Sequence, residues 1–388
     1  MLIQFTVENH RSIKNSAVIS FAASKDKSFD EYLLRPDEKK ALLPVLAIYG
    51  ANAAGKSNVL HAMMTMKEMV VGNAAKVSKG QKLPWEPFGG TKVPTSFEMV
   101  FIFQGVRYTY GFSFDAKKIY KEYLYHWPNG REALIFSREN GVYEFRENVN
   151  EQVTLSNRTP DNKLYLVSSN DWNLPQTENA YRWFLEKLTF LMDEEPATSE
   201  TVAQIASGDD KKARILKELL LADLGITDVT IKNTSGKIPV ITTTHRIINE
   251  DGTTEYFQLL MEQESAGTQH FFARIGGWLQ ALENGALLVV DEIEDSLHPL
   301  LTRRLIEMVQ DKAVNTKGAQ LIFTTHDAML LDLNFFRRDQ IWFAEKNDET
   351  CATELYSLAS FSPRKGENVR KGYLQGRFGA IPFIGGDA

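Results

Sequence analysis

The chain has 388 residues, 43% of them hydrophobic, and a formal net charge of −6, which is ordinary for a globular protein with one large core or two smaller ones. It holds neither a signal peptide nor the apolar run of about eighteen residues that predicts a membrane span. Cys351 is the only cysteine, so an internal disulfide is excluded and a cytoplasmic location is expected. The acidic balance gives no bulk-charge argument for nucleic-acid binding.

Strand-like patterns open the chain and lead into a helix. Residues 2–7 and 17–22 have the alternation of strands, and the polar residues 24–40 predict a loop. The continuous apolar run 42–49 ends at a glycine, which favours a buried parallel strand. Helical spacing of apolar side chains over 57–70 then predicts a helix.

Residues 95–170 are rich in aromatic and β-branched side chains, and we expect a mostly antiparallel lobe there. Its candidate strands are 96–103, 106–114, 118–127, 133–138, 142–145 and 163–167. Plausible turns at 128–130 and 139–141 contain Asn-Gly pairs, which suit tight hairpins.

A helical pattern covers residues 178–224, with an acidic break at 193–196 and the strongest helix propensity over 211–221. Three strand-like segments follow at 228–232, 238–248 and 254–262, and a helix is expected after Gly267. The last third alternates strands and helices, which favours a parallel sheet. Its elements are strands 286–290, 319–324 and 340–344, a helix over 299–310 and a short helix ending at 331.

Residues 50–57, Gly-Ala-Asn-Ala-Ala-Gly-Lys-Ser, fit the phosphate-loop pattern G-x-x-x-x-G-K-[ST] between a predicted strand and a predicted helix. Glycines let backbone N–H groups surround phosphate oxygens. Lys56 is expected to reach the β- and γ-phosphates of ATP, and Ser57 to bind Mg²⁺. The expected nucleotide-binding residues of this segment are Gly50, Asn52, Gly55, Lys56, Ser57 and Asn58.

Two carboxylates, Asp291 and Glu292, end the apolar strand 286–290. Adjacent carboxylates at a buried strand end are costly unless a cation lies nearby. Asp291 is therefore the second expected Mg²⁺ residue, and Glu292 is the expected general base for an attacking water.

Two further features narrow the class of phosphate-loop protein. Ser265 and Gly267 stand at the entry to the predicted helix after residue 267, where free N–H groups can bind an anion, although both residues are also ordinary helix caps. His326 ends the strand 319–324, where it can contact a γ-phosphate. A lone histidine is more often structural, so this expectation depends on its position.

With its motifs in this order, the chain resembles a RecF/SMC-type ABC ATPase. More narrowly, it resembles the compact RloA-like prokaryotic AAA-family ATPases linked to phage defence and abortive infection. The segments that carry the resemblance are 9–12 (Asn-His-Arg-Ser), 50–57, 264–269, 291–299, 324–327 and 373–382. The match covers roughly residues 1–70 and 255–388 and is weak between them.

The resemblance implies an α/β fold, a P-loop NTPase head of the ABC type with an antiparallel β lobe and a helical insertion. In such heads Ser265 and Gly267 contact the γ-phosphate bound by the other subunit, so ATP bridges a homodimer or a higher oligomer. Glu292 and His326 are the catalytic residues on this reading, and residues 294–299 form the loop that joins two heads. The expected domains are an N-terminal ATPase lobe (1–175), a helical insertion (176–227) and a C-terminal ATPase lobe (228–388).

The leading hypothesis is a slow ATPase switch that senses phage or regulates an effector, such as a nuclease encoded nearby. A RecF-like DNA-repair ATPase and an ATP-dependent scaffold with negligible hydrolysis are the alternatives. Arg11 can approach phosphate or lie on the surface, and Gln104 is a weak candidate for a glutamine loop. Two basic groups can hold DNA or be solvated faces: Lys211, Lys212, Arg214 and Lys217, and Arg364, Lys365, Arg370 and Lys371.

Overall fold

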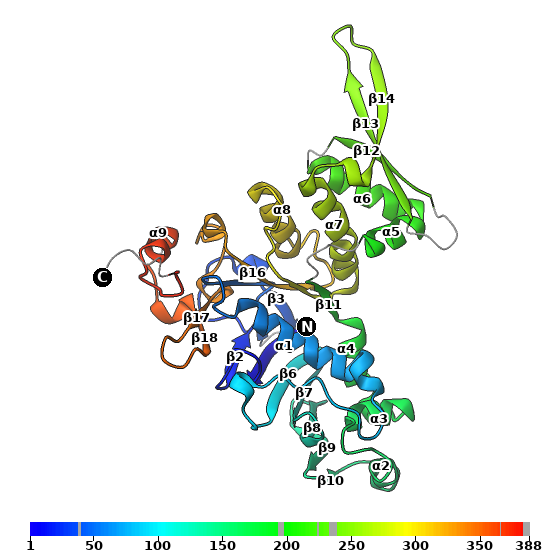
Figure 1. The fold of residues 1–388 in the computed structure, drawn as a ribbon, viewed down its shortest axis with the longest axis vertical. Coiled ribbons are helices and arrows are strands. Elements are labelled where there is room, and N and C mark those ends of the chain that lie inside the picture. The colour runs from blue at the N-terminus through cyan, green and yellow to red at the C-terminus, as the bar shows by residue number, and fades with distance from the viewer. Residues whose placement is uncertain (38–39, 193–197, 223–224, 233–238, 365, 383–388) are drawn as a thin grey trace.

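The computed structural model describes residues 1–37, 40–192, 198–222, 225–232, 239–364 and 366–382. A mainly parallel sheet lies at the centre of the molecule, an antiparallel sheet lies on one side of it, and a β-hairpin arm projects on the other (Figure 1). The fold is α/β, as the sequence predicts.

The central sheet has six strands within the described residues. In spatial order they are β11 (Leu188–Leu191), β15 (Leu287–Val290), β16 (Gln320–Thr325), β5 (Val45–Tyr49), β17 (Ile341–Lys346) and β18 (Thr353–Ser357). The first five are parallel and β18 is antiparallel. The parallel order places the carboxyl ends of β15, β16 and β5 at one edge.

Strand β5 is buried on both faces, which explains its continuous apolar sequence. Leu46 and Ile48 enter one core, whereas Val45, Ala47 and Tyr49 enter the other. The first core contains apolar residues of α1 (Lys56–Val71), and the second contains those of α7 (Ala266–Asn284) and α8 (Pro299–Gln310).

The predicted antiparallel lobe is confirmed as a second sheet. Its order is β10 (Val142–Phe145), β9 (Ala133–Glu139), β8 (Ile119–Trp127), β7 (Val106–Phe114), β6 (Thr95–Phe103), β1 (Leu2–Glu8) and β2 (Ala17–Ser20). α4 (Pro175–Glu186) packs on it, with the Trp183 ring stacked 4.1 Å from the Phe101 ring between centroids. This aromatic contact fixes α4 to the lobe.

The predicted strand 163–167 is wrong, because these residues begin a helix. α2 (Val149–Ser156) and α3 (Tyr165–Asp171) follow β10. The buried Glu122 carboxylate on β8 accepts the N–H groups of Tyr165 at 2.7 Å and Leu166 at 2.9 Å. A carboxylate there satisfies the free N–H groups of the first helical turn. This tertiary contact overrides the local β propensity of the segment.

Two other expectations also need correction. Residues 188–191 lie inside the predicted helical stretch but form β11, which adds to the edge of β15. The predicted loop 24–40 contains β3 (Leu34–Asp37) and the first residue of β4 (Lys40–Leu42), and the two strands pair with each other. The predicted acidic break at 193–196 lies outside the described residues.

The arm is an antiparallel sheet of β12 (Ile226–Lys232), β13 (Val240–Ile248) and β14 (Thr254–Leu260). These strands confirm the three predicted at 228–232, 238–248 and 254–262, as far as the described residues cover them. α5 (Ser199–Ala206) and α6 (Asp209–Leu221) link it to α7. The expected boundary at residue 227 thus falls inside β12. None of the described helices is long and apolar enough to cross a membrane.

Candidate functional site

The candidate site lies at the edge where three neighbouring parallel strands end. Gly50 follows β5, His326 follows β16 and Asp291 follows β15. Ligands of open α/β sheets bind at this carboxyl edge. The structure thus brings together residues that are far apart in the sequence.

Gly55 is a loop position where the backbone and the packing both require glycine. Its φ is 96°, in the left-handed region, and it is the N-cap of α1. A Cβ built there would collide with the hydroxyls of Thr353 and Ser12. The loop therefore approaches these side chains as closely as its backbone allows.

Lys56 is buried, with 5% of its surface exposed, and folds back over its own loop. Its Nζ donates to the carbonyls of Gly50 at 3.0 Å and Ala51 at 3.1 Å and lies 3.3 Å from His326 Nδ1. Burial lowers the pKa of Lys56, and nearby carboxylates, Glu292 foremost, oppose this shift. The ammonium thus sits in a cage of carbonyls beside the histidine.

Ser57 and Asp291 form the predicted hydroxyl–carboxylate pair. Ser57 Oγ donates to Asp291 Oδ1 at 3.1 Å. The Thr324 hydroxyl donates to the same oxygen and accepts the Glu292 N–H at 2.8 Å. Hydroxyl and carboxylate oxygens suit Mg²⁺, so the two residues fit the expected ion. Thr324 was missed as a site residue, although it belongs to the motif 324–327.

Glu292 adopts a φ of 44°, which is uncommon for a residue with a side chain and occurs at functional sites. Its side chain is 56% exposed, and its Oε1 lies 3.3 Å from His326 Nε2. Since Lys56 supplies only protons, His326 Nδ1 must accept and Nε2 must carry the ring proton. Lys56, His326 and Glu292 therefore form one chain of contacts.

Glu294 holds the backbone of the histidine. The His326 N–H donates to Glu294 Oε1, while Oε2 is buried without a hydrogen bond in the described part of the chain. Sequence reasoning placed Glu294 only in the loop 294–299. The acidic run 291–295 was the sequence signal that could have indicated a site role for Glu294.

Asn58 begins a chain of hydrogen bonds that ends at the backbone of the phosphate loop. Its Nδ2 donates to Ser12 Oγ at 2.7 Å, Ser12 Oγ lies 2.7 Å from Thr353 Oγ1, and Thr353 donates to the Ala54 carbonyl at 2.9 Å. Asn58 is thus occupied by a structural contact, whereas Asn52 is exposed at the tip of the loop. No sequence motif pointed to Thr353.

Ser265 and Gly267 begin α7, as predicted. Ser265 Oγ accepts the Thr268 N–H at 3.1 Å, and a Cβ on Gly267 would lie 2.9 Å from the Ser296 carbonyl oxygen. No hydrogen bond among the described residues joins Ser265 or Gly267 to residues 50–57.

A family model described as AAA domain, putative AbiEii toxin, Type IV TA system, matches residues 45–332. The chain belongs to this family of AAA domains. Among solved structures, cbiO1 from Clostridium perfringens, part of the ABC transporter complex cbiONQ, is 12% identical over 97% of this chain and 96% of that chain, with a TM-score of 0.35. No curated protein matches the chain.

The AAA domain contains the phosphate loop, Asp291, Glu292 and His326 within the matched residues. Together with the observed order of strands, this gives a P-loop NTPase head with an antiparallel lobe. The coarse fold and nucleotide-binding class predicted from the sequence are thereby confirmed.

Gln104 is not near this edge. It occupies the turn between β6 and β7 with a φ of 49°. The Met1 amino group donates to the Ile102 carbonyl, and the Leu2 N–H donates to Gln320 at the start of β16. The turn therefore lies toward the amino edge of the central sheet, so the glutamine-loop candidate is wrong.

Other predicted cations are partly neutralised. Arg11 pairs with Glu86, with 2.6 Å between Nε and Oε2. Lys212 and Arg214 pair with carboxylates of Asp228 and Glu283, each at 2.7 Å. Lys365 lies outside the described residues. Ion pairing reduces the charge that the group on α6 offers to a phosphate backbone.

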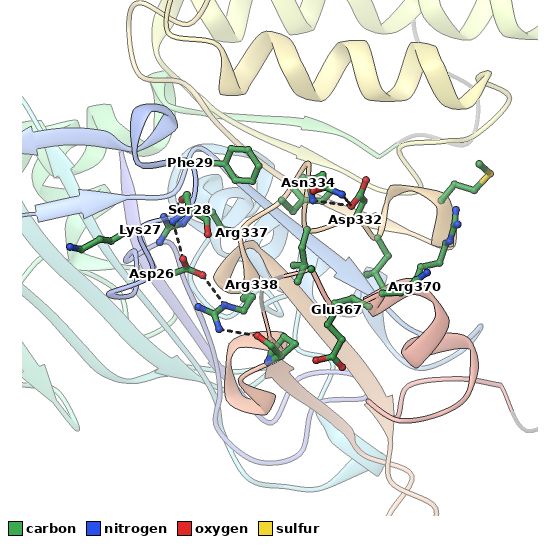
Figure 2. Close-up of a pocket in the computed structure, with 18 of the residues that line it drawn as sticks. Asp26, Lys27, Ser28, Phe29, Asp332, Asn334, Arg337, Arg338, Glu367 and Arg370 are labelled. Carbon is green, nitrogen blue, oxygen red and sulfur yellow. Dashed lines mark hydrogen bonds and ion pairs between the residues drawn. The ribbon is translucent and has the colours of Figure 1, made fainter.

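A cavity of about 730 Å³ lies away from the phosphate loop, between residues 26–31, 329–338, 363 and 366–370 (Figure 2). Arg338 donates to Asp26 at 2.8 Å and to the Pro363 carbonyl at 3.0 Å. These contacts join the N-terminal loop 26–31 to the segment 329–338, which follows His326. None of the predicted nucleotide-binding or catalytic residues lines this cavity, whereas Arg370 of the second basic group does.

Proposed function

We propose that this chain hydrolyses ATP at the edge formed by the ends of β5, β15 and β16. The observation that carries the proposal is the contact chain Lys56–His326–Glu292, with 3.3 Å at both links, beside the Ser57–Asp291 pair. A cation, an orienting histidine, an exposed carboxylate and two hard oxygen ligands are the parts that phosphoryl transfer to water requires.

The residues divide the work as follows. Lys56 exchanges its carbonyl contacts for phosphate oxygens of ATP, and the N–H groups of the loop bind the rest of the phosphate chain. Mg²⁺ at Ser57 and Asp291 neutralises phosphate charge when bound. Glu292 removes a proton from water as the oxygen attacks the γ-phosphorus, and the bond to the bridging oxygen breaks. The products are ADP and inorganic phosphate.

The proposed site is completed by a second copy. Ser265 and Gly267 stand at the start of a 19-residue helix, whose N-terminus carries partial positive charge. Because they lack a bonded contact with the phosphate loop of their own chain, we assign them to the γ-phosphate of a second copy. ATP then bridges the two heads of a homodimer, and ATP hydrolysis loosens the dimer.

We place this switch in cytoplasmic anti-phage defence, where it restrains or releases an effector. The support is the family description, which names a toxin and a toxin–antitoxin system, together with the RloA-like motifs. An effector such as a nuclease fits, because no second catalytic cluster stands out in the described residues.

The test of the ATPase is Glu292→Gln. We expect hydrolysis to fall by about 10²-fold or more because the proton acceptor is lost, while ATP binding persists. Phosphate release and nucleotide binding are the measurements. Glu349→Gln, which replaces an exposed carboxylate in the turn after β17, is the matched control and should hydrolyse at the wild-type rate. An undiminished rate in Glu292→Gln contradicts the assignment of the base.

The regulatory role is tested by a pull-down from the native host with tagged Glu292→Gln, ATP, Mg²⁺ and nuclease treatment. We expect one protein to remain bound in stoichiometric amount, and Lys56→Ala, which lacks the phosphate contact, to lose it. If the tagged protein binds nucleic acid alone, no protein will remain bound after nuclease treatment. A RecF-like repair role then replaces this proposal.

A further inference from the structure

The arm leads into the start of α7 through a short turn that ends at Glu264, directly before Ser265. Strand β14 ends at Leu260, whose N–H donates to Gln263 Oε1 at 2.9 Å, and the Glu264 N–H donates to the Met261 carbonyl at 3.2 Å. The turn is therefore closed by its own hydrogen bonds. Since β13 and β14 project beyond α7 (Figure 1), a displacement of the arm has a short route to the start of this helix.

Two side chains of β13 hold the Glu264 carboxylate. Its Oε1 lies 2.6 Å from His245 Nε2 and accepts the Thr243 hydroxyl. Because a carboxylate accepts hydrogen bonds and does not donate them, His245 Nε2 carries a proton in this contact. The His245 ring is stacked on Phe257 of β14, with 5.0 Å between the centroids and an interplanar angle of 18°. This stacking holds the ring in the orientation in which Nε2 faces Glu264.

The contact between the arm and Glu264 is nearly closed to water. The side chains of Glu264 and His245 are 7% and 13% exposed, and Thr243 is fully buried. A carboxylate at this depth is costly without its hydrogen-bond donors. Loss of the His245 donor therefore favours rotation of the Glu264 side chain toward solvent.

The backbone of Glu264 is bonded to the first turn of α7. Its carbonyl accepts Gln269 Nε2 at 2.8 Å, and the Gln269 N–H donates to the Ser265 carbonyl at 3.0 Å. Ser265 in turn caps the helix by accepting the Thr268 N–H. A rotation at Glu264 therefore shifts the Ser265 backbone and the free N–H groups that α7 presents at its start.

We propose that Glu264 is a positioning residue, through which His245 of the arm sets the place of the α7 start against the γ-phosphate bound by a second copy. The proposal rests on the proposed ATP-bridged dimer, and it gives Glu264 no contact with the nucleotide itself. A misplacement of about 1 Å can lower a reaction rate by about 10²-fold, so a small rotation at Glu264 is sufficient. The hydrolysis site of one copy then depends on the arm of the other.

The experiment uses the full-length chain and compares His245→Ala with His245→Gln. Alanine removes the donor, so the ATP hydrolysis rate at saturating ATP should fall about tenfold or more, while equilibrium binding of ATP stays unchanged. Glutamine keeps an N–H donor and should retain most of the rate. Arg246→Gln, on the opposite face of β13, is the matched control and should hydrolyse normally, because the exposed Arg246 side chain has no hydrogen bond or ion pair in the described chain.

A mixing experiment separates a positioning role from a purely structural one. Lys56→Ala lacks the phosphate contact but keeps an intact α7 start, whereas His245→Ala keeps an intact phosphate loop. Each variant alone should be slow. An equal mixture should hydrolyse ATP faster than either, because the mixed dimer contains one complete site. Ser265→Arg, which blocks the proposed contact directly, is mixed with Lys56→Ala as the reference.

Thermal unfolding checks that each variant is folded, and Thr243→Val, which removes the second donor, replaces His245→Ala if that variant is unfolded. The proposal is overturned if His245→Ala hydrolyses ATP at the wild-type rate, or if His245→Gln is equally slow. If the Ser265→Arg mixture recovers activity and the His245→Ala mixture does not, Glu264 acts only within its own chain. The proposal is then overturned while the proposed function stands. If neither mixture recovers, the ATP-bridged dimer itself fails, and the positioning role fails with it.

Discussion

At the scale of single residues, the site concentrates groups in costly states. Lys56 is a buried cation, Glu292 has a left-handed backbone, and Glu294 keeps one buried oxygen without a hydrogen bond in the described chain. Each state is unfavourable in isolation, and such states persist where the surrounding structure enforces them. Thr324 supports one of them, since its hydroxyl accepts the Glu292 N–H, and it also donates to Asp291.

Thr324→Val should therefore lower the ATP hydrolysis rate by about 10- to 100-fold, as expected for loss of hydrogen bonds to a charged group. Steady-state kinetics measure the effect. Thr302→Val is the matched control, because the Thr302 hydroxyl is buried without a hydrogen bond in the described chain. The prediction fails if the two variants lose activity equally.

At the scale of elements, long-range contacts decide which local pattern prevails. Hydrogen bonds to Glu122 stabilise residues 165–171 as the helix α3, and pairing with β15 stabilises residues 188–191 as the strand β11. A third long-range contact, between Asp26 and Arg338, joins the loop at residues 26–31 to the segment 329–338 after His326 (Figure 2). Burial alone would raise the pKa of Asp26, but hydrogen bonds from Ser28 and Arg338 outweigh it and lower the pKa to about 2.

Asp26→Asn should destabilise the protein by about 1 kcal/mol at pH 7, a value reduced for solvent screening. Because the folded pKa lies below the ordinary value of 3.8, the Asp26 contribution is full above pH 3.8 and is lost as pH falls toward 2. Urea unfolding at pH 7 and pH 3.5 measures the difference between variant and wild type, which should shrink at the lower pH. Asp30→Asn, in an exposed pair with Arg35, should change stability little at either pH.

At the scale of the whole molecule, the two sheets are joined through a buried amide. Gln320 at the start of β16 accepts the Leu2 N–H at 2.6 Å and donates to the Leu2 and Leu43 carbonyls at 3.0 and 3.3 Å. The contact bonds the first strand of the antiparallel lobe to the central sheet. These hydrogen bonds therefore hold the antiparallel lobe in a defined position relative to the central sheet and its phosphate loop.

Gln320→Leu should cost about 3 kcal/mol, because the buried backbone groups of Leu2 lose their partner. Calorimetry should then show a lower melting temperature and a separation of the lobe transition from that of the central sheet. Gln310→Leu, which removes one 3.4 Å bond to the Phe335 carbonyl, should cost about 1 kcal/mol or less and keep a single transition. Equal losses would argue against a joining role for Gln320.

Local sequence was sufficient to predict the phosphate loop, the Asp291–Glu292 pair, the cap at Ser265 and α8, whose predicted limits 299–310 are those observed. These features are encoded by neighbouring residues, through backbone freedom, alternation and capping, so a short window of sequence contains their physical cause.

Tertiary structure alone decided the rest. Ser12 and Thr353 are 341 residues apart in the chain and meet under the phosphate loop, and α3 exists where an isolated segment favours a strand. Such outcomes depend on which groups packing brings within hydrogen-bonding distance, and burial makes an unmade bond costlier than a poor local propensity. Local pattern therefore specified the chemistry of this site, and packing specified its arrangement.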